Sequence, residues 1–429
     1  MKLESVPTRP EAGDPSAGSG GRLGRRSFMV GVPAAAAGLA LAPSAFAISR
    51  QDLNASASWA AAPVSAAPAA DNQINNQTIR QVVHLSVGGD SLRVKLSNRY
   101  GTSTLVVSAA TIGVSAGNEN AQAGSARTLT FNGRTFFTIP AFGELYSDWI
   151  GWNVPSQSDL VIDVYIASNT SSGTSPLTLH NARPAGQVLS YLANGNVAGT
   201  PTFPTVASRT AWYFLTGVDV SNSRSPGSVC CFGDSITDGS WSTIGANARY
   251  PDYLAQRLLA ASPSAPMGVV NLGIGGNRVL ATGTGDSALA RFDRDVLAQT
   301  GVYNIVVLEG INDISGGATA PRIIDGHRQL IRRAHSKGKK IYGATLTPYG
   351  NAPEAREAER QAVNAWIRSS GEYDAVIDFD AAVRDPANPR VMLAMYDSGD
   401  TLHPNSAGYA AMANAVPLSL FAGPRPRLL

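Results

Sequence analysis

The sequence has little cysteine and little net charge. The only two cysteines, Cys230 and Cys231, are adjacent, and a bridge between adjacent residues would be badly strained, so disulfides are excluded as the basis of the fold. The sequence has 34 basic and 31 acidic residues, and no long run of like charge occurs. This balance leaves no excess that would hold a phosphate backbone, so nucleic acid is excluded as an expected partner.

The chain is long and apolar enough to fold around one or two cores. It has 429 residues, of which 44% are hydrophobic and 15% charged, so disorder as the main state is excluded. A typical domain of about 150 residues gives two or three domains. The 43 glycines and 26 prolines indicate many turns and loops.

The N-terminal segment has the pattern of an export signal. Arg25-Arg26-Ser27-Phe28 precedes an apolar stretch from Met29 to Leu41 and then Ala45-Phe46-Ala47, and this order resembles a twin-arginine signal with a cleavage site. The apolar stretch contains Pro33 and is shorter than the roughly 20 residues of a spanning helix, and no later segment is a better candidate. We expect residues 1–47 to be removed and the protein to be exported, to a periplasm or to the medium.

Residues 48–222 have the pattern of an antiparallel β-sandwich. Short alternating runs are separated by turn residues, and the runs 82–87 and 92–96 around Gly88-Gly89-Asp90 predict a hairpin. Further strands are expected within 104–108, 128–131, 135–139, 160–166 and 211–220. The polar stretch from Ser221 to Gly227 predicts a linker.

Residues 228–429 alternate between β and α patterns. Strands are expected at 229–232, 268–272, 304–308, 340–346 and 375–379, and helices at 250–261, 287–298, 320–336, 354–370 and 406–418. Repeated units of this kind predict an α/β fold with a parallel sheet covered by helices on both faces. Ligands then bind at the loops that leave the carboxyl ends of the strands.

Two of these loops carry a hydroxyl and closely spaced glycines. Gly233-Asp234-Ser235 can hold a serine on a tight turn at a strand end, although Gly-Asp-Ser is also common in plain turns. The loop Asn271–Arg278 can direct backbone N–H groups at an oxyanion or a phosphate, or be a turn without chemistry. A dinucleotide site is disfavoured, because Arg278 stands where the last glycine of its motif belongs.

Two further loops carry an amide and a histidine with a carboxylate. Asn312, in Gly310-Ile311-Asn312-Asp313, can donate a hydrogen bond to a developing oxyanion or can cap a helix. Asp400 precedes His403 by three residues and can fix the orientation of its imidazole. Metal binding by this pair is the alternative, but no third ligand has a supporting spacing.

The other four histidines are weaker candidates for catalysis. His84 is in a predicted strand, and His327 and His335 are in a polar helix, where a solvated face explains them. His180 is either a surface or a core residue. The spacing leaves His403 as the candidate base.

Together the four loops resemble the sequence blocks of the SGNH hydrolases, the GDSL esterases and lipases, over roughly residues 228–418. The resemblance implies a flavodoxin-like three-layer α/β/α fold, with Ser235 as nucleophile, His403 as general base and Asp400 orienting it. It also implies an oxyanion hole made by the Ser235 N–H, the Gly276 N–H and the Asn312 side chain, with no metal or organic cofactor. Gly310-Ile311 departs from the two glycines of many members, and Asp234 is interpreted as bracing the loop.

Three functions follow from this resemblance. The first is hydrolysis of carboxylic esters of short acyl groups or lipids, the second is removal of acetyl groups from polysaccharide, and the third is glycan binding without catalysis. We expect a small or polymer-linked ester as the partner and no stable membrane insertion after signal removal; the oligomeric state is open. The β-rich domain resembles accessory domains of some carbohydrate esterases, and Trp59, Trp149, Trp152 and Trp212 either stack on sugars or, as we favour, fill its core.

Overall fold

The computed structural model describes residues 49–66, 73–170, 176–181 and 190–423. The predicted export signal lies outside these residues. Across the described ranges, no helix is long and apolar enough to cross a membrane. Residues from Ile48 onward form one compact unit.

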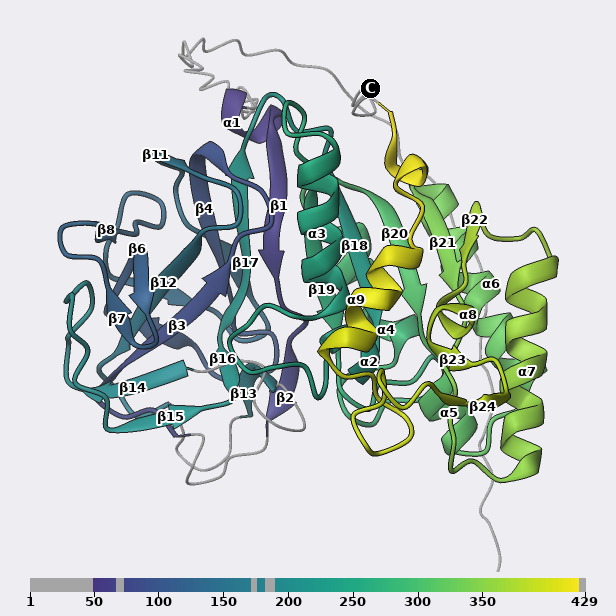
Figure 1. Cartoon of the computed structure of the whole chain (residues 1–429). Coiled ribbons are helices and arrows are strands. Elements are labelled where there is room, and N and C mark those ends of the chain that lie inside the picture. The colour runs from purple at the N-terminus through teal and green to yellow at the C-terminus, as the bar shows by residue number, and fades with distance from the viewer. Residues whose placement is uncertain (1–48, 67–72, 171–175, 182–189, 424–429) are drawn as a thin grey trace, which may run out of the picture. The chain divides into compact units, whose positions relative to one another are not determined.

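The first part of this unit is built from antiparallel sheets (Figure 1). One sheet has the order β1 (Ala55–Ala60), β17 (Leu215–Ser221), β4 (Gly89–Ser97) and β10 (Glu144–Tyr146), with β11 (Ile150–Val154) also on β4. The other has the order β15 (Ala207–Arg209), β14 (Ser190–Asn194), β3 (Gln77–His84), β12 (Asp159–Ile166), β6 (Ala109–Gly117) and β7 (Asn120–Ala121), with β8 (Arg127–Thr128) on β6. A smaller sheet has the order β16 (Ala211–Tyr213), β13 (Leu177–Asn181) and β2 (Val64–Ala66). In another, β5 (Leu105–Val107) pairs with β9 (Phe137–Ile139). The prediction of a β-sandwich is confirmed.

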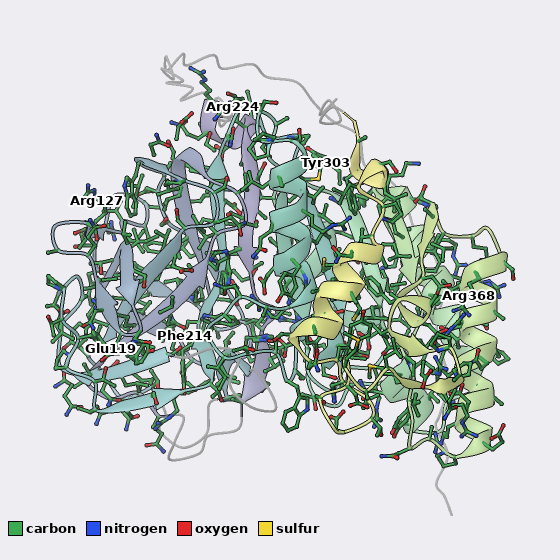
Figure 2. The ribbon with its side chains drawn as sticks, viewed as in Figure 1. Glu119, Arg127, Phe214, Arg224, Tyr303 and Arg368 are labelled. Carbon is green, nitrogen blue, oxygen red and sulfur yellow. The ribbon has the colours of Figure 1, made fainter. Side chains whose placement is uncertain are left out.

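The core of the sandwich follows from the strand period of two. Leu92, Val94 and Leu96 alternate along β4 and are fully buried, and they share one core cluster with the apolar residues of β12. Phe214 is buried between β16 and β17, whereas Arg127 lies at the outer edge of this region (Figure 2). Of the four tryptophans, Trp59 and Trp212 fill the core as favoured, but Trp149 and Trp152 are partly exposed and pack under Arg93 and Arg127.

The predicted hairpin around Gly88-Gly89 is wrong. β3 pairs with β12 and β14, while β4 pairs with β17, β10 and β11, so the two strands belong to different sheets. Neither glycine has the positive φ that a two-residue hairpin turn requires. A Cβ on Gly88 would lie 2.1 Å from the carbonyl oxygen of Val154, so this glycine serves close backbone packing instead.

The second part has a five-stranded parallel sheet. Its order is β19 (Gly268–Gly273), β18 (Ser228–Gly233), β20 (Val302–Leu308), β21 (Lys340–Ala344) and β22 (Ala375–Ile377). Numbered along the chain this is 2-1-3-4-5, the order of a flavodoxin-like sheet, so the predicted fold class is confirmed. Every residue of β18 is buried, as expected for a central strand covered on both faces.

Helices follow the strands at the positions expected from the sequence. The longer ones are α3 (Tyr250–Ala261), α6 (Ala320–Ser336), α7 (Glu354–Ser369) and α9 (Ser406–Ala415), and α3 and α9 lie side by side (Figure 1). The shorter elements are α1 (Arg50–Leu53), α2 (Ser235–Asp238), α4 (Ala288–Phe292) with a π-helical turn at Asp293–Leu297, α5 (Ile311–Ser315), α8 (Phe379–Val383), β23 (Arg384–Asp385), β24 (Asn388–Met392) and a 3-10 turn at Leu418–Phe421. Pro251 and Pro321 each stand in a first helical turn, where a missing N–H costs nothing.

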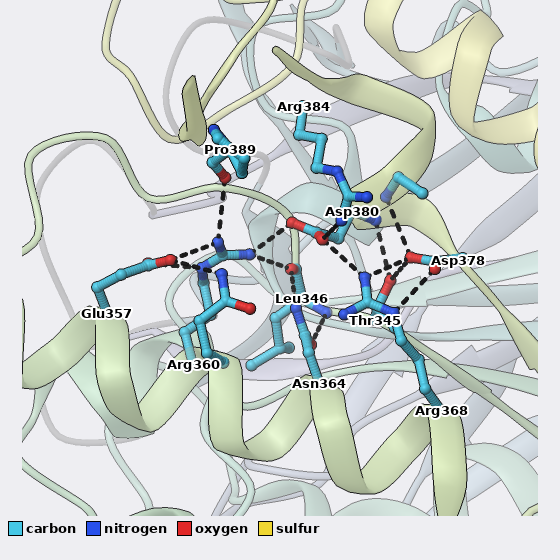
Figure 3. Close-up of polar contacts among 12 residues, drawn as sticks. Thr345, Leu346, Glu357, Arg360, Asn364, Arg368, Asp378, Asp380, Arg384 and Pro389 are labelled. Carbon is cyan, nitrogen blue, oxygen red and sulfur yellow. Dashed lines mark hydrogen bonds and ion pairs between the residues drawn. The ribbon is translucent and has the colours of Figure 1, made fainter. Parts of the chain in front are cut away.

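A buried ion cluster fixes α7 against α8 and the end of β21 (Figure 3). Arg360 donates to both carboxylate oxygens of Glu357 and to Asp380, and also to the carbonyl of Leu346 at 2.9 Å. Its guanidinium is almost fully buried. The cluster therefore supplies acceptors for an arginine that the core would otherwise exclude.

The two parts share one hydrophobic core. β1 lies beside β19, and a Cβ on Gly268 would lie 2.4 Å from the carbonyl oxygen of Ala57. The stretch predicted as a linker is partly buried, since Asn222 donates to the carbonyl of Gly88 and Ser225 is enclosed. The β-rich part thus packs directly on the parallel sheet.

Candidate active site

The Ser235 turn leaves the carboxyl end of β18. A Cβ on Gly233 would lie 2.2 Å from the carbonyl oxygen of Leu308, so glycine is required where β18 passes β20. Asp234 caps α2, and its Oδ1 accepts from the amide of Ile236 at 2.9 Å. Ser235 becomes the first helical residue, only 7% exposed. The interpretation of Asp234 as bracing the loop agrees with this contact.

Ser235, His403 and Asp400 form a continuous chain of hydrogen bonds. Ser235 Oγ lies 2.8 Å from His403 Nε2, and His403 Nδ1 lies 2.6 Å from Asp400 Oδ2. Because a carboxylate only accepts, Nδ1 carries the hydrogen and Nε2 accepts from the serine hydroxyl. The geometry suits transfer of the serine proton to the imidazole.

The carboxylate of Asp400 is held by its own loop. Its Oδ1 accepts from the amides of Leu402 at 2.9 Å and His403 at 2.8 Å, and Thr401 between them has a left-handed φ of 65°. Burial alone would raise the pKa of Asp400, but the hydrogen bonds from the His403 amide and side chain and from Leu402 lower it. Asp400 is therefore ionised at neutral pH.

The three predicted oxyanion donors come from neighbouring strand ends. β18 lies between β19 and β20, so the Ser235, Gly276 and Asn312 loops meet at one edge of the sheet, where α2 and α5 begin (Figure 1). Gly276 has a φ of 75° and is exposed. Among the described residues, the amides of Ser235 and Gly276 donate to no protein group. Asn312 Nδ2 donates to the carbonyl of Asn277 at 2.9 Å and lies 3.4 Å from Asp234 Oδ2.

Buried carboxyl groups lie behind these loops. Burial raises the pKa of Asp234 to about 7, and the nearby Asp313 adds to the effect. Burial, followed by the Asp234 carboxyl, raises the pKa of Glu309 well above its ordinary value. Neither carboxyl oxygen of Glu309 has a hydrogen-bond partner in the described structure, and Arg291 is 4.0 Å away. Glu309 is therefore held in its neutral form.

Arg291 was not found from the sequence, although it contacts two of these loops. It donates to the carbonyls of Gly233 and Leu272 at 2.9 and 2.8 Å and to Asn277 Oδ1 at 2.9 Å. A signal was present, because Arg291 shares the helical face of the buried apolar residues Ala288, Phe292 and Val296. A charged residue on such a face requires buried partners.

The other histidines differ from the prediction in one case. His327 is completely buried, not solvated: its Nε2 donates to the carbonyl of Glu309, its Nδ1 accepts from Tyr373, and burial lowers its pKa to about 4. His335 pairs with Asp374 at the surface, as expected. His180, left open by the sequence, is buried. Within the described residues, no group of three His, Cys, Asp or Glu side chains could hold a metal ion, Asp400 and His403 included.

Comparison with known proteins supports the interpretation of this half of the chain. Residues 231–411 match the GDSL-like Lipase/Acylhydrolase family. Comparison with curated proteins gives no match. Similar solved structures include a G-D-S-L family protein from Desulfitobacterium hafniense DCB-2, which is 21% identical and has a TM-score of 0.36, with 44% of this chain and 96% of that chain covered.

Two further solved structures are similar over the same share of this chain, 44%. One is a mutant of an acetyl-xylooligosaccharide esterase from Geobacillus Stearmophilus, 24% identical, with 92% of that chain covered and a TM-score of 0.36. The other is a carbohydrate acetylesterase from Sinorhizobium meliloti, 14% identical, with 95% covered and a TM-score of 0.35. Residues 231–411 are thus similar to the GDSL-like lipase/acylhydrolase family, and this match supports a carboxylic ester hydrolase.

Proposed function

We propose that the protein hydrolyses carboxylic esters through a Ser235–His403–Asp400 triad and an acyl-enzyme. The observation that carries the proposal is the hydrogen-bonded chain from Ser235 Oγ through the imidazole to the Asp400 carboxylate. A neutral serine is a weak nucleophile, so a base must take its proton during attack. The 2.8 Å contact between Ser235 Oγ and His403 Nε2 supports His403 as that base.

The steps balance with this one imidazole. Ser235 Oγ bonds to the ester carbon while its proton moves to His403 Nε2, and the carbonyl oxygen becomes an oxyanion. The imidazolium then gives the proton to the leaving alcohol as the carbon–oxygen bond breaks. Water repeats the sequence on the acyl-serine and releases the acid.

The oxyanion would be met by the amides of Ser235 and Gly276 and by Asn312 Nδ2. Both amides have no protein acceptor within the described residues, which leaves them available to a substrate oxygen. Asn312 keeps one hydrogen on the Asn277 carbonyl and can exchange its long contact with Asp234 for the oxyanion.

Exposed apolar side chains in loops joined to the segment after His403 favour esters with an apolar group as the first candidate substrate. Trp241, Ile244 and Met395 are 41%, 53% and 66% exposed. Their loops are joined to the segment after His403, since Ser406 Oγ accepts from the Thr243 amide and Asn405 donates to the Met395 carbonyl. Apolar surface gathered at a reactive site is typical of ligand contact.

The experiment compares wild-type protein with Ser235→Ala on p-nitrophenyl esters of increasing acyl length and on acetylated xylan. We expect the rate to rise beyond acetate and to vanish in the variant while its circular dichroism spectrum is unchanged. Faster acetate release from xylan than from any p-nitrophenyl ester would favour the second candidate, polysaccharide deacetylation. Binding of xylan without hydrolysis of any ester would leave the glycan-binding alternative.

We also propose that the chain is divided into domains at residues 48–222 and 228–429. A separate proposal is that residues 1–47 direct export through a twin-arginine pathway. Cys230 and Cys231 are free and buried, which suits a protein exported after folding without oxidative pairing. Replacing Arg25 and Arg26 by lysine should retain the protein inside the cell. Secretion of that variant at the normal level would contradict the proposal.

A further inference from the structure

The β-rich region contacts two of the loops that carry the proposed active site. His180, on β13, reaches the nucleophile turn, and Tyr100, after β4, reaches the glycine loop. Both contacts cross between parts that are far apart in the sequence. A region that only bound substrate would not need these polar contacts, of which the one made by His180 is buried and the one made by Tyr100 is partly buried.

His180 holds the end of α2. Its Nε2 lies 3.0 Å from Asp238 Oδ1 and its Nδ1 lies 2.8 Å from the carbonyl of Ala62, and both His180 and Asp238 are buried. Asp238 is the last residue of the four-residue helix that begins with Ser235. A shift of Asp238 would therefore move the nucleophile directly.

The two partners of His180 define its charge. A carboxylate and a carbonyl oxygen only accept hydrogen bonds, so both ring nitrogens donate and the imidazole is cationic. Burial alone would lower the pKa of His180, and Arg249 acts in the same direction, but Asp238 and the Ala62 carbonyl raise it. The contact is a buried ion pair whose loss would leave the Asp238 carboxylate without its partner.

Tyr100 supports the glycine loop through Asp286. Its hydroxyl donates to Asp286 Oδ2 at 2.9 Å, and burial, with the Asp286 carboxylate adding to it, raises the pKa of Tyr100 to about 12, so the proton stays on the donor. The backbone carbonyl of Asp286 accepts from Asn277 Nδ2 at 2.8 Å.

Asn277 connects this contact to two oxyanion donors. It directly follows Gly276, and its own carbonyl accepts from Asn312 Nδ2 at 2.9 Å. The side chain of Asn277 is buried, with its donors on the carbonyls of Thr284 and Asp286 and its Oδ1 on Arg291. Asn277 therefore has no free polar group in its side chain that could absorb a shift of the loop.

We infer that the β-rich region is part of the catalytic apparatus, in which His180 positions the nucleophile turn and Tyr100 positions the oxyanion loop. The inference rests on the proposed function, because it assigns these residues to the Ser235 site. Both are positioning residues and act through Asp238 and Asn277. Small displacements of reacting groups reduce turnover strongly, so kcat is the quantity that these contacts protect.

The test uses two substitutions in the full chain, each with a matched control. Tyr100→Phe deletes only a hydroxyl, and Tyr165→Phe does the same at a tyrosine that bonds Asn76 inside the β-rich region. His180→Gln removes the cation, and His84→Gln does the same at a histidine whose partners, Asp159 and Gln157, are also in the β-rich region. We measure kcat and KM on p-nitrophenyl acetate, the rate of inactivation by an organophosphate, and the melting temperature.

We expect kcat and the inactivation rate to fall on the order of tenfold or more in Tyr100→Phe and His180→Gln, with KM unchanged, and both controls to keep wild-type values. If His180→Gln does not fold, Tyr100→Phe still decides. Equal kcat in Tyr100→Phe and Tyr165→Phe would overturn the inference. So would a raised KM with unchanged kcat, which would assign the region to substrate binding. A wrong assignment of the triad would be recognised separately, because Ser235→Ala would then keep its esterase activity.

Discussion

At the scale of single residues, Asn312 has a role that substitution can isolate. Its side chain supplies one of three proposed oxyanion donors, and loss of one such donor typically lowers turnover by on the order of 10²–10³. We therefore expect Asn312→Ala to lower kcat by that factor while KM changes little, measured on p-nitrophenyl acetate. A raised KM with normal kcat would place Asn312 in ground-state substrate binding instead.

Glu309 makes stability depend on pH. Its folded-state pKa is raised by burial, so above the unfolded value of about 4.3 the folded protein keeps a proton that the unfolded chain releases. Stability is therefore lost as pH rises from that value towards the folded pKa. Gln keeps the shape and has no such proton, so Glu309→Gln should stabilise the protein at pH 7 and less at pH 5.

Urea unfolding at both pH values measures the difference, which cannot exceed about 1.4 kcal/mol per pH unit. Glu354→Gln is the control, because the Glu354 side chain is 82% exposed and only pairs with Arg390 at the surface. A stabilisation of Glu309→Gln that is the same at pH 5 and pH 7 would contradict the assignment of a raised pKa.

The candidate site residues that could be selected from the sequence are those that lie in short motifs. Ser235 is two residues after Gly233, and Asp400 and His403 are three residues apart, so local spacing was enough to select them as candidates. The contacts of His180 and Tyr100, and that of Arg291 with Gly233, span 58 to 186 positions of sequence, and no local pattern marks these partners. His327 was misassigned because a polar helix still has one buried face.

At the scale of helices and strands, Arg360 holds α7 in place through buried contacts with Leu346 and Asp380. Arg360→Met would leave the buried Glu357 carboxylate without its cation, whereas Asp380 would keep Arg368 and Arg384. Breaking a buried pair in this way typically costs about 3–5 kcal/mol. We expect a loss of that size in urea unfolding, with kcat of the folded protein unchanged (Figure 3).

Arg368→Met provides the comparison, because the Arg368 side chain is 30% exposed and water can replace it. Its loss of stability should be clearly smaller. Equal losses in the two variants would mean that burial of the ion pair does not decide the cost.

Elements were predicted well where periodicity and end signals agreed. The bounds expected for α3 and α6 coincide with the structure, because each has a proline in its first turn and an apolar face of helical period. The strand expected at 92–96 lies within β4, but the one expected at 82–87 overlaps β3 only at 82–84, and the pairing of the two was wrong. Alternation along a strand says which face is buried and does not say which strand lies beside it.

At the scale of the whole molecule, the fold class was predictable, but the packing of the β-rich part against the parallel sheet was not. Alternating β and α segments require a parallel sheet, and the observed order 2-1-3-4-5 brings the catalytic loops to one edge. The turn residues of 221–227 predicted a linker, yet this stretch is held in place, since Asn222 donates to the carbonyl of Gly88 and Ser225 accepts from Ser56. Composition reports turns but carries no information about what packs over them.

The shared core predicts that both parts unfold together. One cluster of buried apolar side chains extends from β1 and β17 through β18, β19 and β20, so the β-rich part cannot separate without exposing the edge of the parallel sheet. In a variant with Trp241 and Trp366 replaced by phenylalanine, the remaining four tryptophans all lie in the β-rich part. Their fluorescence and the loss of esterase activity should have the same midpoint in urea. Activity lost at lower urea than fluorescence would mean that the catalytic part unfolds independently, and the contacts through His180 and Tyr100 would then be too weak to couple the two.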